Sequence, residues 1–172
     1  MSDAISETQR QQVNALLGRD ARGLREIPVT DCAGRPRVIR VASVVDDKPF
    51  PTLYWLVDRD INYRIDQLEA GGLISELQAQ VDADPDLQAA MAEDHRVHIE
   101  RRNALMTPAD REALEASGLF ETLQSRGIGG IEKPTRIRCL HTWYAAHLVE
   151  PNTIGRLVDP HLTSGEASPD VT

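Results

Sequence analysis

The sequence predicts an α+β fold, in which a small antiparallel sheet packs against several helices within a single domain. Two observations support this prediction: segments rich in β-branched residues gather in the first third of the chain, and capped helical segments fill the middle. Because the strands precede the helices and do not alternate with them, an α+β arrangement is favoured over a doubly wound parallel sheet. At 172 residues the chain is long enough for one core and short for two. We assign residues 1–150 to the domain and 151–172 to a C-terminal extension, whose last ten residues are expected to be disordered.

The first third of the chain is predicted to form one helix and three strands. Apolar residues at helical spacing predict a helix over residues 6–17, which Gly18 ends. A short strand is expected around residues 24–29, and RVIRVASVV at 37–45 predicts a second strand. The apolar run FPTLYWLV at 50–57 indicates a buried strand, which we expect to pair antiparallel with the second one.

Helices in the middle of the chain begin at residues suited to capping. Asp58 and Asp84 can accept hydrogen bonds from free backbone amides at a helix start. Pro85 then occupies the first helical position, and Thr107 followed by Pro108 repeats this pattern. Helices are therefore predicted over residues 58–70, 73–81, 85–105 and 107–114.

A glycine turn, a short basic strand and a last helix are predicted near the C-terminal end. The GIGGI segment at 127–131 is expected to use positive φ angles, which glycine adopts easily. The basic strand follows it, and the helix is predicted to start near Cys139. Residues at spacings of three and four along this helix share an inward face: Leu140, Trp143, Tyr144 and His147.

The composition limits the classes of partner. A formal net charge of −8 disfavours nucleic-acid binding, because phosphate backbones are repelled. No segment approaches the roughly 18 to 20 apolar residues of a membrane span, and the N-terminus lacks the apolar run of a signal peptide. The two cysteines form no CxxC pair, which indicates free thiols and a cytoplasmic location.

Basic residues form two short clusters, one containing Arg37 and the other Arg138. If the fold brings these clusters together, they can bind a small anion. The alternative, which we favour, is that both are solvated strand faces.

Three interpretations compete for the thiol and imidazole groups near the last helix. Cys139 and a histidine, either His141 or His147, can bind zinc or iron together with Cys32 on its loop and Asp58 at a strand end. Alternatively, Cys139 is a nucleophile activated by a histidine, at a helix entrance where the dipole favours a thiolate. In the third interpretation the cysteine is a small core residue and His147 is a satisfied buried histidine.

A second histidine pair, His95 and His98, lies on the predicted helix over 85–105. Two histidines three residues apart share a helix face and can chelate a metal. Their neighbourhood, AEDHRVHIERR, is densely charged, so we favour a solvated helix face.

Six segments in a fixed order resemble a known bacterial family. They are LLGRDARGL (16–24), Cys32-x-Gly34-x-Pro36, FPTLYWL (50–56), QLEAGGL (67–73), GIGGI (127–131) and RCLHTWYAAH (138–147). Together they resemble the family named domain of unknown function 501, which brings no established activity. Family members often carry a cysteine where this chain has Asp58, and cysteine and aspartate share the ability to ligate a metal. The resemblance therefore favours a ligand role for Cys32, Asp58, Cys139 and either His141 or His147.

The leading functional hypothesis is a cytoplasmic metal-binding protein. If it is an enzyme, hydrolysis by a metal-activated water is expected, with Arg37 or Arg138 orienting an anionic substrate. A non-enzymatic regulatory or adaptor protein, which binds a protein partner through its acidic helices, is the first alternative. A thiol-dependent enzyme that uses Cys139 is the second.

Overall fold

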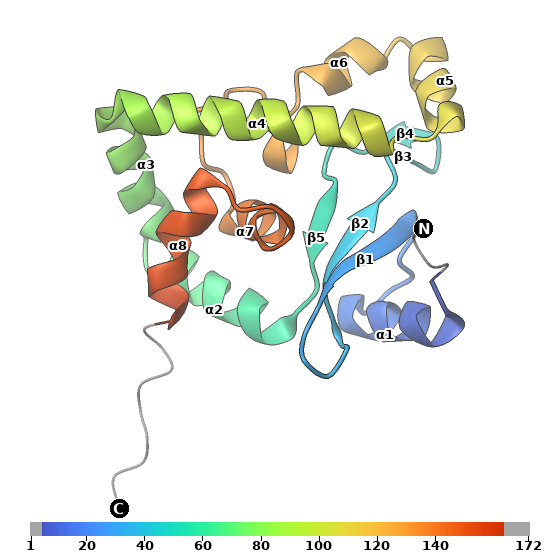
Figure 1. Cartoon of the computed structure of the whole chain (residues 1–172), viewed down its shortest axis with the longest axis horizontal. Helices are drawn as coiled ribbons and strands as arrows, with labels where there is room; N and C mark the ends of the chain where they lie inside the picture. The colour runs from blue at the N-terminus through green and yellow to red at the C-terminus, as the bar shows by residue number, and fades with distance from the viewer. Residues whose placement is uncertain (1–4, 164–172) are drawn as a thin grey trace, which may run out of the picture.

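A computed structural model describes residues 5–163 of the chain, and it confirms the α+β class (Figure 1). A three-stranded antiparallel sheet and a small hairpin pack with helices in one compact body. Of the last ten residues, which we expected to be disordered, all but Thr163 lie outside the described range.

The sheet has the order β1-β2-β5, formed by Leu24–Thr30, Pro36–Val41 and Tyr54–Leu56. Both outer strands run antiparallel to β2. This confirms the antiparallel pairing predicted for β2 and β5. The hairpin of β3 (Val44–Val45) and β4 (Lys48–Pro49) occupies the connection between β2 and β5.

Helix α1 (Glu7–Leu17) covers one side of the sheet. Ser6 caps it in a reciprocal capping box, and its Val13 is completely buried. Val13 forms a small second core with Leu24 and Ile39 of the sheet and with Val57, which directly follows β5.

The helices of the middle begin at the predicted caps. Asp58 caps α2 (Arg59–Ala70), Asp84 caps α4 (Pro85–Leu105), and Thr107 caps α5 (Pro108–Ala116). Three further elements lie among them: α3 (Leu73–Ala83), α6 (Phe120–Gln124) and the short 3-10 turn η1 (Ile128–Gly130).

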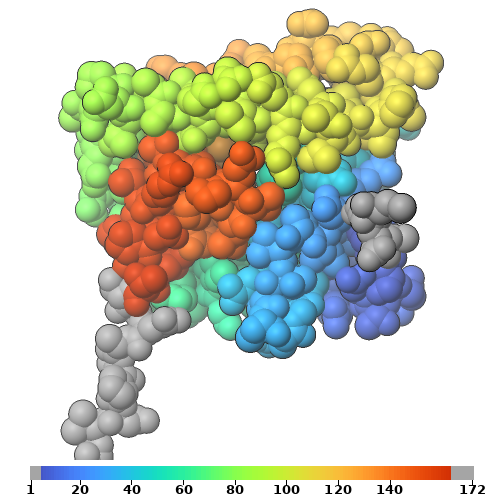
Figure 2. Space-filling view, in the orientation of Figure 1, coloured from blue at the N-terminus to red at the C-terminus, as the bar shows by residue number. Residues whose placement is uncertain are grey.

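The main core is built around α7 (Leu140–Val149), which lies between α2 and α4 in Figure 1. Its Leu140 and Trp143 are completely buried. We predicted no element beyond Pro151, but α8 (Thr153–Thr163) packs against α7 through buried Ile154, Val158 and Leu162. In Figure 2 the orange and red atoms of these last helices lie directly beneath the green and yellow atoms of α4.

The predicted basic strand before α7 is wrong, because residues 132–139 form no strand. Gln78 of α3 takes the place of a strand partner. Its side-chain carbonyl accepts from the Ile137 amide at 2.9 Å, and its amide donates to the Thr135 carbonyl at 2.9 Å. The glycine turn before this segment has the predicted positive φ angles, 66° at Gly129 and 71° at Gly130.

The expectation of a solvated face at His95 and His98 is also wrong, since both side chains are buried. His95 Nδ1 accepts from the Ile128 amide at 2.9 Å, and Nε2 lies 3.1 Å from the Pro134 carbonyl oxygen. Both nitrogens of His95 therefore hold the loop that leads to α7. Burial lowers the pKa of His95, and lowers that of His98 to about 3, so both rings are neutral at neutral pH.

Arg102 of α4 is a fully buried cation. Its guanidinium donates to three backbone carbonyl oxygens, those of Pro51 at 3.1 Å, Leu123 at 2.5 Å and Arg126 at 2.7 Å. Burial lowers its pKa to about 10, which keeps it protonated at neutral pH. It ties α4 to the connection between β4 and β5 and to the C-terminal end of α6.

Candidate metal centre

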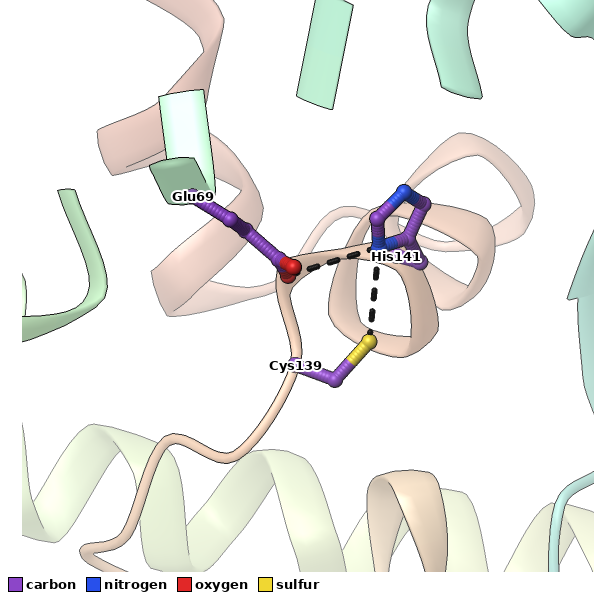
Figure 3. A group of neighbouring side chains, drawn as sticks. All are labelled: Glu69, Cys139 and His141. Carbon is purple, nitrogen blue, oxygen red and sulfur yellow. Dashed lines mark hydrogen bonds and ion pairs between the residues drawn. The ribbon is translucent and has the colours of Figure 1, made fainter. Parts of the chain in front are cut away.

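Three side chains with different ligand chemistry meet where α2 ends and α7 begins (Figure 3). Glu69 lies in the last turn of α2, Cys139 is the N-cap residue of α7, and His141 lies in its first turn. One ligand atom from each lies within 4.8 Å of the others, so the group can hold a metal ion. We refer to these three residues as the Glu–Cys–His group.

Short contacts define the geometry of the group. The Cys139 sulfur lies 3.4 Å from His141 Nδ1, and Glu69 Oε1 lies 3.3 Å from the same nitrogen. Glu69 Oε1 also accepts from the Leu140 amide at 2.6 Å. The Cys139 side chain makes no capping bond, so Glu69 caps α7 from another helix.

The other side of the His141 ring faces a second carboxylate of α2. His141 Nε2 lies 3.1 Å from Asp66 Oδ1. When Nε2–H donates to Asp66, a neutral ring turns its Nδ1 lone pair toward the Glu69 carboxylate, which is repulsive. The hydrogen bond with Cys139 is the largest cause that raises the pKa of His141, to about 9, and both carboxylates add to it. A proton or a metal cation at Nδ1 removes the repulsion.

Two of the three separations between the ligand atoms match those around a tetrahedral metal ion. Zinc–sulfur bonds of about 2.3 Å and zinc–nitrogen bonds of about 2.0–2.1 Å, at tetrahedral angles, place sulfur and nitrogen about 3.5 Å apart. Nitrogen and oxygen ligands are then about 3.3 Å apart. The separations in the Glu–Cys–His group are 3.4 Å and 3.3 Å. The third separation, from the Cys139 sulfur to the Glu69 carboxylate, is within 4.8 Å.

The group contains two of the residues that the sequence singled out, Cys139 and His141, but neither Cys32 nor Asp58. Cys32 is an exposed free thiol on the β1–β2 loop. Asp58 caps α2 and forms an ion pair with Arg37 at 3.1 Å.

The two candidate anion-binding residues differ in their surroundings. The charge of Arg37 is paired with Asp58, whereas Arg138 is exposed next to Cys139.

His147, the remaining candidate ligand, lies six residues after His141 in α7 and holds α8 in place. Its Nδ1 accepts from the Asn152 amide at 3.1 Å, and its Nε2 lies 3.0 Å from Asp159 Oδ2. Asp159 Oδ1 accepts from the Tyr144 hydroxyl at 2.9 Å. Both ring nitrogens of His147 are thus occupied at the joint between α7 and α8.

Comparison with known protein families gives one result. A family model described as "Protein of unknown function (DUF501)" matches residues 28–160, from β1 to α8. The chain belongs to this family. The match confirms the resemblance found in the sequence and includes the whole Glu–Cys–His group. No curated protein and no solved structure matches the chain. Within residues 5–163, no helix of this DUF501 protein is long and apolar enough to cross a membrane.

Sequence reasoning missed the two carboxylates of α2, Glu69 and Asp66. They precede Cys139 by about seventy positions, and acidic residues are frequent in this chain. One signal was present, since Glu69 lies within QLEAGGL, one of the six segments that carry the family resemblance.

A cavity of about 280 Å³ adjoins the Glu–Cys–His group. His141 and Thr142 form one wall, and residues 52 and 54–56 in and beside strand β5 form the other. Tyr54, Trp55 and Leu56 make that second wall largely apolar. The imidazole therefore lies between two carboxylates and a space open to a small molecule.

Proposed function

We propose that this protein binds one transition-metal ion, zinc or iron, through Glu69, Cys139 and His141. The observation that carries the proposal is the distance of His141 Nδ1 from the other two donors, 3.4 Å to sulfur and 3.3 Å to oxygen, which matches the spacing of ligands around a tetrahedral ion. Asp66 supports it, because metal-binding histidines usually donate their second N–H to a carboxylate. The free Cys139 thiol that the site needs agrees with the cytoplasmic location expected from the sequence.

Three protein ligands leave a fourth tetrahedral position for water, which is the pattern of catalytic rather than structural zinc sites. An ion held by the three residues would lower the pKa of the water in the fourth position, and this water could then hydrolyse a substrate. The cavity beside His141 gives a substrate access to the site, and exposed Arg138 offers a charge for an anionic group.

Metal content measured on protein purified without an affinity tag tests the proposal. We expect about one equivalent of zinc or iron per chain, and a loss of most of it in Cys139→Ala and Glu69→Gln. Glu69→Gln keeps a carbonyl oxygen for the Leu140 amide, so it separates metal binding from helix capping. Cys32→Ala is the matched control, because Cys32 is exposed and lies outside the group. Metal below about a tenth of an equivalent, unchanged by Cys139→Ala, would overturn the proposal.

A second candidate function, thiol catalysis, is favoured by the order of three groups in space. Cys139, His141 and Asp66 form a chain in which sulfur, imidazole and carboxylate follow one another at 3.4 Å and 3.1 Å. A nucleophile, a base and a carboxylate that orients the base occupy these positions in thiol enzymes. The cysteine also lies at a helix N-terminus, as a thiolate prefers.

Alkylation rates separate the two functions, and Cys32 serves as an internal reference. Mass spectrometry can follow both cysteines of the metal-stripped protein at pH 7. Thiol catalysis requires the Cys139 peptide to react several-fold faster than the Cys32 peptide, although Cys32 is more exposed. Slower reaction of Cys139 argues against it. Protection of Cys139 alone by added zinc supports the metal proposal.

A further inference from the structure

A second cavity, of about 570 Å³, lies between the turn after α1 and the β3–β4 hairpin. It is about twice the size of the cavity beside His141 and shares no residue with the Glu–Cys–His group. Sites for small organic ligands usually measure about 300 to 1,000 Å³, so this cavity has room for one.

Its floor is aromatic. Phe50 and Trp55 pack with their ring centroids 5.5 Å apart, and Val41 and Pro49 extend the apolar surface. The guanidinium carbon of Arg19 lies over the Trp55 ring, 5.1 Å from its centroid. Aromatic rings and a stacked guanidinium plane are surfaces on which planar heterocycles bind.

Basic side chains outnumber acidic ones around this second cavity. Arg19, Arg22 and Lys48 line the cavity together with Asp20 and Asp46. Asp46 is paired with Arg22 at 2.8 Å, and Asp20 accepts from a side-chain amide of α1 at 2.8 Å. Within the part of the chain that the structure describes, neither Arg19 nor Lys48 has an ion-pair partner. Three cations and two carboxylates line the cavity, so it carries an excess of one positive charge in a chain of net charge −8, which favours an anionic ligand.

The turn after α1 is packed tightly against the chain that leads into the β3–β4 hairpin. At Gly23, in the turn after α1, a Cβ atom would lie only 2.7 Å from Val45 Cγ2, so only glycine allows this approach. The Gly23 carbonyl accepts from the Ala42 amide at 2.8 Å. The turn that carries Arg19 and Arg22 is thereby fixed against the hairpin that carries Lys48.

We propose that this cavity binds a planar aromatic ring that carries an anionic group, either a phosphate or a carboxylate. The ring packs on the surface formed by Phe50, Trp55 and Arg19, and the anion is neutralised by Lys48 and Arg19. The site shares no residue with the Glu–Cys–His group, although Trp55 lines both cavities, so it is expected to bind its ligand equally well in Cys139→Ala.

Two matched ligand pairs test the proposal on the full chain and identify the anion. AMP is compared with adenosine, and nicotinate with nicotinamide, by calorimetry and by tryptophan fluorescence excited beyond the ligands' absorption. Trp143 is completely buried, so a ligand-dependent change reports on Trp55. Trp55 lines both this cavity and the one beside His141, and the effect of a Lys48 variant distinguishes the two, because Lys48 lines only this one. We expect at least one anionic member to bind about tenfold or more tightly than its neutral partner. Inorganic phosphate alone is expected to bind weakly, because it lacks the ring.

The two lysines of the chain provide a matched pair of variants. Lys48→Gln is expected to lower the affinity for the anionic ligand roughly tenfold. Lys133 is also exposed, and Lys133→Gln is expected to leave the affinity unchanged. Arg19→Gln provides a second test if Lys48→Gln does not fold. The proposal is overturned if neutral and anionic members bind equally, if neither anion binds below about 1 mM, or if both lysine variants weaken binding alike.

Discussion

His141 Nε2 lies 3.1 Å from Asp66 Oδ1, on the side of the ring away from Cys139. Because one N–H of the ring is directed at Asp66, Nδ1 is the nitrogen at which a metal would replace the proton. Asp66 touches none of the other proposed ligands, so its role is to position the ring.

Asp66→Asn is therefore expected to weaken zinc affinity by about tenfold while leaving one ion per chain. Competition with a chelating dye measures the affinity. Glu112→Gln is the control, because Glu112 is an exposed carboxylate on α5, outside the Glu–Cys–His group. Equal affinities for Asp66→Asn and the wild type would remove Asp66 from the site.

Arg102→Met is expected to lower the free energy of unfolding by more than about 3 kcal/mol, because three carbonyl oxygens inside the protein lose their donor. Arg96→Met on the same helix is the control. Arg96 is an exposed residue whose ion pairs are with Glu93 and Glu100, and its loss is expected to change stability by less than about 1 kcal/mol. Urea unfolding measures both. Similar values for the two variants would contradict the structural role of Arg102.

Gly155→Ala is expected to destabilise the joint between α7 and α8. A Cβ atom at Gly155 would lie 2.0 Å from His147 Cγ, so the imidazole must move and lose its contacts with Asn152 and Asp159. We expect a loss of at least about 2 kcal/mol in the free energy of unfolding. In a His147→Ala background the same change is expected to be much milder, because the obstructing ring is gone. A double-mutant cycle by thermal or urea unfolding measures this coupling, and additive effects would refute it.

Stability is expected to fall as the pH drops below about 6.5, where histidines of the unfolded chain gain protons. Burial lowers the pKa of His98 to about 3, so the folded state stays neutral there while the unfolded state binds a proton. The contribution of His98 to the free energy of unfolding is therefore complete above about pH 6.5. It is lost toward pH 3, by about 1.4 kcal/mol per pH unit. His95 contributes in the same direction.

Unfolding free energies between pH 7.5 and pH 5 measure this dependence. His98→Phe is expected to reduce the slope, and it loses no hydrogen bond at Nε2, which has no partner among residues 5–163. His161→Gln, at an exposed histidine, is expected to leave the slope unchanged. A wild-type slope retained in His98→Phe would show that His98 is protonated in the folded state.

Elements defined by neighbouring residues were predicted well from the sequence. The Asp84–Pro85 and Thr107–Pro108 pairs place two helix starts, because capping involves only residues in the same turn. The glycine turn was predicted for the same reason. The basic strand was wrong because its backbone is held by Gln78, about sixty residues earlier, and no local pattern contains that information.

The same limit applies to the site. Cys139 and His141 are neighbours, so their meeting follows from helix geometry, whereas Glu69 and Asp66 reach them only through the packing of α2 on α7. For a related reason, the burial of His95 and His98 was not predicted. Charges on the outer face of α4 hid the fact that these two rings point into the core.

The distance in sequence between Glu69 and Cys139 has a consequence for the unfolded chain. An ion bound by both residues would join α2 to α7 as a crosslink and close a loop of about seventy residues. A crosslink that closes so long a loop lowers the conformational entropy of the unfolded chain more than one between neighbouring residues. The metal would therefore act on stability as a long-range disulfide does. Removal of the ion would then lower the melting temperature of the whole domain as well as empty the site.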